Sequence, residues 1–322
     1  MSEYQYYEFL AVDQPLDERQ QAEVRALSTR ARITATSFAN EYHWGDFRGD
    51  PSTLMARYYD AHLYYANWGT RRVMLRLPRK ILSLEVAERY CVDPYVTASV
   101  SQENLVLDLT SEADPDDWSE ESESRLDAII GVRAELAAGD RRPLYLAWLA
   151  AYGTWERNED AFSDDHEDVL EPSVPAGLRT LTGAQRALAD FLCVDADLLK
   201  VAAQASPPLA RPKDDARDLT DWIKNLPDRD KDELLRRVAQ GQGAQVQMEL
   251  MRQFRGGHDG PGNGRRTVAE LLDAAAEFRN ERERREEAER AAEKARRERA
   301  LARGKRLDST SDSNGRRRSA SW

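Results

Sequence analysis

The sequence predicts an α+β fold: a mostly antiparallel sheet with helices comes first, an all-helical body follows, and a long charged helix ends the chain. Three observations predict it. Strand-type runs alternate with helical spacing only as far as Leu109. The segments after Leu109 keep helical spacing, and after Phe278 charged residues and alanines replace the apolar stripe.

The N-terminal module, residues 1–111, contains all the predicted strands. Tyr4 to Val12 reads YQYYEFLAV and is expected in the middle of the sheet, because both of its faces are largely apolar. The further predicted strands are Arg32 to Phe38, Arg72 to Leu77 with its strict alternation, and a hairpin of Tyr95 to Val100 with Leu105 to Leu109. Helices are predicted after Asp17, over Ser52 to Tyr65, and through Leu84 to Tyr90.

Residues 112–255 are predicted to form the helical body. Its helices are expected over Leu126 to Leu136, Leu144 to Trp155, Leu178 to Leu192, Asp195 to Ala205, Leu219 to Asn225, Asp228 to Ala239 and Gln245 to Phe254. Three prolines between Ser206 and Pro212 suggest a sub-boundary at 206–216. A flexible glycine-rich joint at 256–266 precedes a charged helix at 267–303 and a disordered tail at 304–322.

Composition and charge narrow the classes of protein. The 322 residues hold 47 Lys and Arg against 58 Asp and Glu, and this net charge of −11 disfavours non-specific capture by nucleic acid or anionic lipid. The longest apolar stretch, Leu144 to Trp155, is shorter than the roughly 20 residues that span a bilayer. The start lacks signal-peptide features, and Cys91 and Cys193 have no disulfide or zinc spacing. We therefore expect a cytoplasmic protein with no membrane partner, cofactor or metal.

The aromatic loop Tyr42 to Asp46 is the main candidate site. His43 and Asp46 there are candidates for an acid–base pair, and Arg71 with Arg72 for holding an anion. Trp44 either stacks on a ligand or pins the loop to the core. The sequence has no G-x-S-x-G, H-E-x-x-H or phosphate-loop motif, so a non-enzymatic role is favoured and an enzyme stays the open alternative.

Several charged residues have a structural interpretation beside a functional one. His62 lies on an apolar stripe and is expected to be a hydrogen-bonded core histidine, and Glu8 is expected to pair with Arg72 or Arg76 across the sheet. The acidic stretches Glu112 to Asp127 and Glu156 to Glu171 are solvated segments, or they bind a basic partner or a cation.

The C-terminal end differs from the remainder in charge. Residues 279–322 hold 15 Lys and Arg against 9 Asp and Glu, so this segment alone is basic. Its arginines Arg316, Arg317 and Arg318 are candidate anion contacts that could include phosphates. Interspersed glutamates favour a solvated or self-docking helix over an arm that binds nucleic acid.

Four segments carry a resemblance to a known family: YQYYEFLAVDQPL at Tyr4 to Leu16, ALSTRARIT at Ala26 to Thr34, NWGTRRVMLRLP at Asn67 to Pro78, and LLKVAAQASPPL at Leu198 to Leu209. The sequence resembles an uncharacterised family of bacterial proteins from its N-terminus to about Phe254. The resemblance implies a cytosolic bacterial protein whose body is one unit and whose charged tail is an appendage. It implies no reaction, cofactor or catalytic residue.

Three hypotheses for function follow. The first is a non-enzymatic protein-interaction or scaffold protein of the bacterial cytosol, which engages a protein partner through its charged surfaces and its projecting helix. The second is association with nucleic acid through the basic tail, or through Arg72 and Arg76. The third is an undetected enzyme centred on His43 and Asp46.

Overall fold

The computed structural model describes residues 3–112, 125–153, 168–209, 216–240 and 266–318, with the single residues 243, 246, 250 and 254. Within these ranges, side chains are described except at 125, 216–218 and 300–318. The chain forms two compact units, Met1–Leu272 and Asp273–Trp322.

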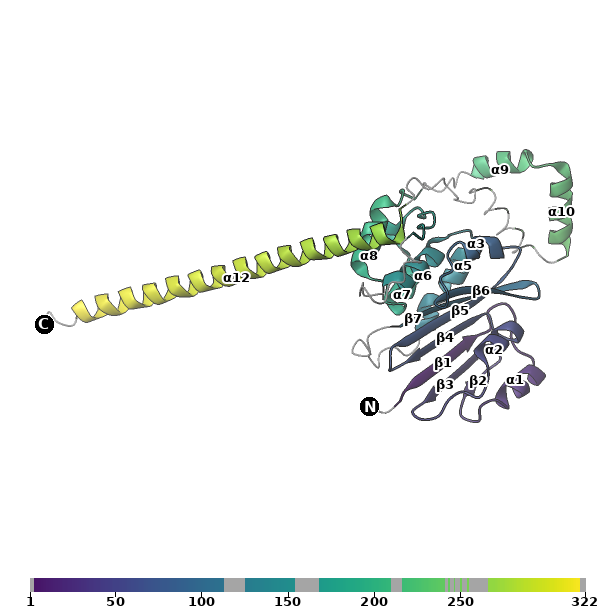
Figure 1. Cartoon of the computed structure of the whole chain (residues 1–322), viewed down its shortest axis with the longest axis horizontal. Helices are drawn as coiled ribbons and strands as arrows, with labels where there is room; N and C mark the ends of the chain where they lie inside the picture. Colours follow the sequence, from purple (N-terminus) through teal and green to yellow (C-terminus); the bar gives the residue numbers. More distant parts are fainter. Residues whose placement is uncertain are drawn as a thin grey trace. The chain divides into compact units, whose positions relative to one another are not determined.

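An antiparallel sheet of seven strands organises the first unit (Figure 1). The strand order is β2-β3-β1-β4-β5-β7-β6, so β1 lies inside the sheet, as its two apolar faces predict. The bounds are β1 Gln5–Leu10, β2 Arg32–Ile33, β3 Ser37–Tyr42, β4 Ala61–Ala66, β5 Thr70–Pro78, β6 Val96–Ser101 and β7 Asn104–Glu112. Three helices lie between these strands and the remaining ones follow β7, and the predicted α+β class is confirmed.

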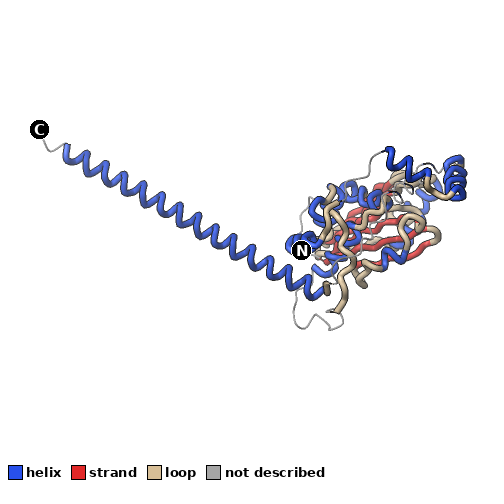
Figure 2. The backbone as a smooth tube through the Cα atoms, turned by 90° about the horizontal axis from the view of Figure 1, so that it is seen from above, coloured by secondary structure: helices blue, strands red, loops and turns tan. Residues whose placement is uncertain are grey.

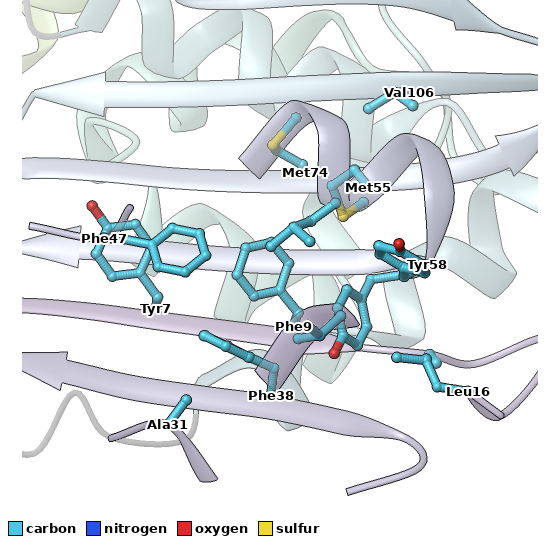
Figure 3. Close-up of a cluster of buried hydrophobic side chains, with 14 residues drawn as sticks. Tyr7, Phe9, Leu16, Ala31, Phe38, Phe47, Met55, Tyr58, Met74 and Val106 are labelled. Atoms are coloured by element: carbon cyan, nitrogen blue, oxygen red, sulfur yellow. The ribbon is translucent and has the colours of Figure 1, made fainter. Parts of the chain in front are cut away.

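Helices cover both faces of the sheet, whose strands form one layer in Figure 2. On one face, α1 and α2 pack over a buried cluster that includes Phe9, Phe38, Met55 and Met74 (Figure 3). On the other face, the leucines of β5 and β7 lie under α5 and α6, and α6 is buried nearly all round, as its sequence predicts. The helices are α1 Glu18–Arg25, α2 Pro51–Arg57, α3 Leu84–Glu88, α4 Arg125–Ile129, α5 Gly131–Ala137, α6 Arg142–Gly153, the 3-10 turn η4 Leu178–Thr180, α7 Gly183–Phe191, α8 Ala196–Ala205, α9 Ala216–Lys224, α10 Asp228–Ala239 and α12 Val268–Arg318.

A buried ion pair fixes α2 to the sheet. Asp60, 1% exposed, accepts at Oδ1 from Nε and Nη2 of Arg76, at 3.0 and 2.7 Å. Its Oδ2 accepts from the backbone N–H groups of Val12 and Asp13 at 2.7 and 2.8 Å. Arg76 Nη1 donates to the carbonyl of Met55 near the end of α2 at 3.0 Å. One carboxylate and one guanidinium thereby join the ends of β1 and α2 to β5.

The β3 side of the sheet ends in a very short strand. β2 pairs with β3 only at Ala39 and Phe38. At the next position, the side chain of buried Asn40 accepts from the backbone N–H of Glu41 at 3.1 Å and donates to Ser28 Oγ at 2.9 Å. The backbone donor of Glu41 is therefore satisfied by a side chain and not by a further strand.

Two of the predicted elements are wrong in part. The predicted helix over Ser52 to Tyr65 is α2 followed by the strand β4, because Asp60 is held by Arg76 and the chain changes direction there. The predicted strand Arg32 to Phe38 is broken by a turn in which Thr34 N donates to the carbonyl of Ser37, and β3 continues into the segment predicted as loop. The predicted hairpin, now β6 and β7, and the strand β5 are confirmed.

A buried ion pair also anchors the start of α12. Arg266 donates to both carboxylate oxygens of Glu171 at 2.9 and 2.8 Å, and Tyr145 donates to the same carboxylate. Thr267 and Glu270 form a capping box: the backbone N–H of Glu270 donates to Thr267 Oγ1 at 3.2 Å, and that of Thr267 donates to Glu270 Oε2 at 2.9 Å. The predicted helix is therefore confirmed, with its first turn fixed to the body.

The second unit consists of the continuation of α12, an unbroken helix in Figure 2. It runs past the predicted end at Arg303 to Arg318. One glycine, Gly304, costs a helix only about 1 kcal/mol and need not end it. At 51 residues, α12 is about 75 Å long.

Candidate functional site

The aromatic loop after β3 is anchored by side chains of β1. Gln5 lies opposite Tyr42 in the sheet, and its Nε2 donates to the carbonyl of Gly45 at 3.1 Å. The hydroxyl of Tyr7 lies 2.8 Å from Asp46 Oδ1, which also accepts from the backbone N–H of Phe47 at 2.7 Å. Asp46 therefore fixes the loop to the sheet.

Two tyrosines and Gln5 extend this network across the sheet. The rings of Tyr7 and Tyr64 lie 4.7 Å apart, and Tyr64 donates to Gln5 Oε1 at 3.1 Å. Burial, and secondly the hydrogen bond to Asp46, raise the pKa of Tyr7 above its usual value. Burial likewise raises the pKa of Tyr64 to about 12. Both hydroxyls keep their protons at neutral pH, so the network holds the loop by neutral donors.

The predicted acid–base pair does not form. The exposed ring of His43 lies 5.2 Å from Tyr4, which contacts Tyr65, whereas Asp46 contacts Tyr7. Tyr4 and Tyr7 point to opposite faces because side chains alternate along a strand. The geometry gives His43 no role in moving a proton to or from Asp46.

Trp44 is 67% exposed, so it does not pin the loop to the core as one interpretation proposed. The guanidinium of Arg30 lies 4.5 Å from the centre of its ring. The loop is held by Gln5 and Tyr7 instead, and the indole remains open to solvent. Its role as a ligand or partner contact stays a prediction.

The predicted shared anion site of Arg71 and Arg72 is wrong. The two side chains lie on opposite faces of β5: Arg71 donates to the carbonyl of Phe191 at 3.3 Å, and Arg72 forms a two-pronged ion pair with Asp108, with Nε to Oδ1 at 2.7 Å. Asp108 raises the pKa of Arg72 above its usual value. Arg72 is engaged by its own protein and lies beside the tyrosine network on the same face of the sheet.

His62 is a core residue, as predicted. Its ring stacks on Phe9 with 4.0 Å between centres, and its Nδ1 lies 2.8 Å from the carbonyl oxygen of Glu8. Burial lowers the pKa of His62 to about 3, so it is neutral at physiological pH.

The prediction that Glu8 pairs with Arg72 or Arg76 is wrong, because Glu8 lies on the other face of the sheet. Burial, and secondly the charge of Asp127, raise the pKa of Glu8 to about 7. Its Oε2 is buried with no hydrogen-bond partner among the described residues. Glu8 is therefore a carboxyl group that titrates near neutrality inside the fold.

The charged helix α12 carries ion pairs between residues four apart along its own surface. Arg285, Arg290 and Arg297 each lie within 4 Å of the glutamate four residues before them, at 3.3, 3.9 and 2.6 Å. Such pairs stabilise a helix by about 0.2 to 0.5 kcal/mol each without any core. The side chains of Arg316, Arg317 and Arg318, the candidate anion contacts, lie outside the described residues.

The described residues contain no group of three or more His, Cys, Asp or Glu side chains arranged to hold a metal ion. Most of the two acidic stretches, residues 113–124 and 154–167, lies outside the described ranges, so cation binding there stays a prediction. In the part of the chain that was searched, no helix combines the length and the apolar character needed to cross a membrane.

Sequence reasoning missed Gln5, Tyr7 and Tyr64, whose side chains form the network that holds the loop, and Asp108, which pairs with Arg72. The alternation in YQYYEFL places Gln5 and Tyr7 on one face and was a usable signal. Comparisons with protein-family models, with curated proteins and with solved structures each found no match. The resemblance to a bacterial family therefore stays an expectation.

Proposed function

We propose that this chain is a non-enzymatic scaffold of the bacterial cytosol that engages a protein partner through its charged C-terminal helix. The observation that carries the proposal is the continuation of α12 to Arg318 from Ala275, the last buried residue among the side chains of α12 that the structure describes. From Arg279 to Arg299 the helix has charges of both signs and no apolar residue larger than alanine. We call residues 279–318 the arm.

The arm stabilises itself instead of completing a core. Its side chains from Arg279 to Arg299 are exposed or half-buried, and its ion pairs lie along its own surface. A helix that is polar all round gains nothing by folding onto an apolar surface. A partner with a complementary charge pattern would gain ion pairs to it at little ordering cost, because the helix is already formed.

The loop around His43 supports an enzyme less well. Its polar groups hold the loop in place, and the two residues expected to share a proton contact opposite faces of β1. The excess of Lys and Arg in 279–322 favours nucleic acid as the second candidate, through phosphate contacts that weaken steeply with salt.

Truncation of the arm tests the proposal. The full chain and a chain ended after Arg279, which keeps the buried residues Val268, Leu271 and Ala275, are purified from the native host with and without nuclease. A third protein carries repeats of Glu-Ala-Ala-Ala-Lys, of the same total length, in place of the arm. This replacement keeps the helix and its length and changes the charge pattern.

We expect a defined protein that survives nuclease, is absent from both altered chains, and binds the purified full chain directly. Loss of all co-purifying material on nuclease treatment would favour the nucleic-acid candidate. A partner set that is unchanged on truncation would contradict any role of the arm.

A further inference from the structure

The charges of the arm are unevenly distributed along it. Residues 279–293 hold five arginines and six glutamates, whereas residues 294–306 hold seven Lys and Arg against one glutamate. Both stretches belong to the unbroken helix α12 (Figure 2), so the chain changes there in charge and not in conformation. We call residues 294–306 the basic segment, which is about 20 Å long at the rise of an α-helix.

Four arginines of the basic segment occupy one face of the helix. Their spacing is three, four and three residues, and residues three and four apart are neighbours on a helix surface. With 3.6 residues per turn, the four positions fall within an arc of about 80°. We call them the arginine stripe: Arg296, Arg299, Arg303 and Arg306. The positions of Lys294 and Lys305, about three turns apart, are on the opposite face.

Among the described side chains, the ion pairs within α12 end at Arg297. A carboxylate oxygen of Glu286 lies 3.0 Å from Arg282 Nη1, and one of Glu293 lies 2.6 Å from Arg297 Nη2. Arg296 and Arg299 are exposed, and neither takes part in an ion pair with another described side chain. Their neighbours within the stripe are further arginines. The helix therefore does not compensate the charge of the stripe by itself.

An acidic partner would relieve this uncompensated charge. Like charges three or four residues apart on a helix repel each other and destabilise it. A carboxylate against each arginine removes that repulsion, and a guanidinium binds a carboxylate through two parallel hydrogen bonds. The arginine stripe therefore favours a ligand that carries carboxylates over a neutral or apolar one.

We propose that the arginine stripe binds an acidic helix of the partner protein, whose carboxylates repeat at the same spacing of three and four residues. Successive positions of the stripe are about 5 Å apart along the helix axis. A second helix with the same spacing has the same repeat, so each guanidinium can face one carboxylate along the contact. This inference rests on the proposed function, because it names the chemistry of the partner that the arm engages.

The phosphates of a nucleic acid are the alternative source of negative charge. They attract every cation of the basic segment, so binding depends on the number of cations and hardly on the face that carries them. A partner helix, by contrast, reaches one face. The concentration of four of the seven cations on one face favours the helix, and the net charge of −11 disfavours a long polyanion. The two lysines of the opposite face discriminate between these ligands.

The test uses the full chain and two synthetic probe helices. One probe, the spaced probe, carries four glutamates at intervals of three, four and three residues, with alanine and glutamine between them. The spread probe has the same composition, with its glutamates distributed around the helix. Binding of each labelled probe is followed by fluorescence anisotropy at about 50 mM salt, where exposed charges are weakly screened.

Two double variants remove the same charge from different faces of the helix. The stripe variant combines Arg296→Gln with Arg299→Gln, and the lysine variant combines Lys294→Gln with Lys305→Gln. Glutamine has nearly the same helix propensity as arginine and lysine, so circular dichroism should show equal helix content in the wild type and both variants.

We expect the spaced probe to bind the wild-type protein. The stripe variant should bind it about fivefold more weakly, which is the change that two exposed ion pairs supply. The lysine variant should lose less than about twofold, because its lysines act on the probe only at a distance. The spread probe should bind the wild-type protein several-fold more weakly than the spaced probe.

Three results would overturn the proposal. The first is no binding of the spaced probe at concentrations up to about 1 mM. The second is an equal loss of affinity in the two variants, or equal affinity for the two probes, because net charge alone would then explain binding. The third is an oligonucleotide that binds more tightly than the spaced probe and is weakened equally by both variants, which would assign the basic segment to nucleic acid.

Purification from the native host separates this inference from the proposed function. A nuclease-resistant protein that the wild type and the stripe variant capture equally, and the truncated chain does not, would keep the proposed function and overturn the stripe as the contact. Capture by the wild type and the lysine variant, but not by the stripe variant, would support both.

Discussion

Replacing Glu8 by glutamine should stabilise the protein at neutral and higher pH. Glu8 is largely buried against Tyr6 with Asp127 nearby, and its pKa is raised from 4.5 to about 7. The native state therefore favours the protonated carboxyl group, whereas the unfolded chain ionises it at the ordinary value. Glu8→Gln keeps the shape of the side chain and removes the charge.

The sign and size of the effect follow from the two pKa values. Below pH 4.5 the carboxyl is protonated in both states and contributes no pH dependence. Between 4.5 and about 7 the unfolded chain loses its proton first, so the free energy of unfolding falls as pH rises, and it stays low above that range. A rise in the pKa from 4.5 to about 7 lowers the free energy of unfolding at high pH by at most about 3 kcal/mol. Because Glu8 is partly exposed, we expect about 1 to 2 kcal/mol.

Urea unfolding of wild type and Glu8→Gln across this pH range measures the difference directly. The titration of His62 is common to both proteins and cancels in the difference. Glu41→Gln is the matched control, because Glu41 is exposed and lies on the same face of the sheet. Parallel stability curves for wild type and Glu8→Gln, or a variant that is less stable than wild type at about pH 8, would refute the reasoning.

Three further predictions concern buried titratable groups. Asp60→Ala should lower the free energy of unfolding by about 3 to 5 kcal/mol, because it leaves the guanidinium of Arg76 without its charged partner. Asp13 is half-exposed, so Asp13→Ala should lower the free energy of unfolding by less than about 1 kcal/mol. Equal losses for the two variants in urea unfolding would contradict this. His62, with its pKa lowered to about 3 from 6.5, should make the wild type lose stability as pH falls below 6.5, and His62→Gln should flatten that slope in the same assay. Glu171→Gln should cost about 2 to 3 kcal/mol and speed hydrogen exchange at the first amides of α12, because Arg266 loses its charged partner; unchanged exchange there would show that the pair does not anchor the helix.

Strong local patterns predict the second half of the sheet well. The alternation of β5 and the paired runs of β6 and β7 can be read from the sequence, since their residues are of strand type and the connection between β6 and β7 is short. The sequence does not show that Met74 and Val106, on the second face, are buried as well. The ion pairs of α12 follow from spacing alone, because they need no partner outside the helix.

The segment Ser52 to Tyr65 misleads because two short elements together imitate one long helix. Leu54 and Met55 of α2, and Leu63 of β4, are all buried, and their spacing fits a helical stripe by coincidence. The break between them depends on Asp60 meeting Arg76, a contact across the sheet that no local pattern contains.

The candidate site is predictable only in part for a similar reason. The predicted strand begins at Arg72 and leaves Arg71 outside it, whereas β5 begins at Thr70, so its alternation places Arg71 and Arg72 on opposite faces. The pairing of Tyr7 with Asp46, by contrast, depends on the register between β1 and β3, which the sequence does not specify.

The way the sheet ends at β3 has a consequence for the protein at high concentration. Unpaired edge strands are where folded proteins join into fibres and non-specific aggregates. Here the partner strand is two residues long and Asn40 occupies the next backbone donor, so another molecule finds little to extend along this side. Asn40→Val would free the backbone N–H of Glu41 and add a β-branched residue. This variant should therefore self-associate through the β3 edge at concentrations where the wild-type protein does not.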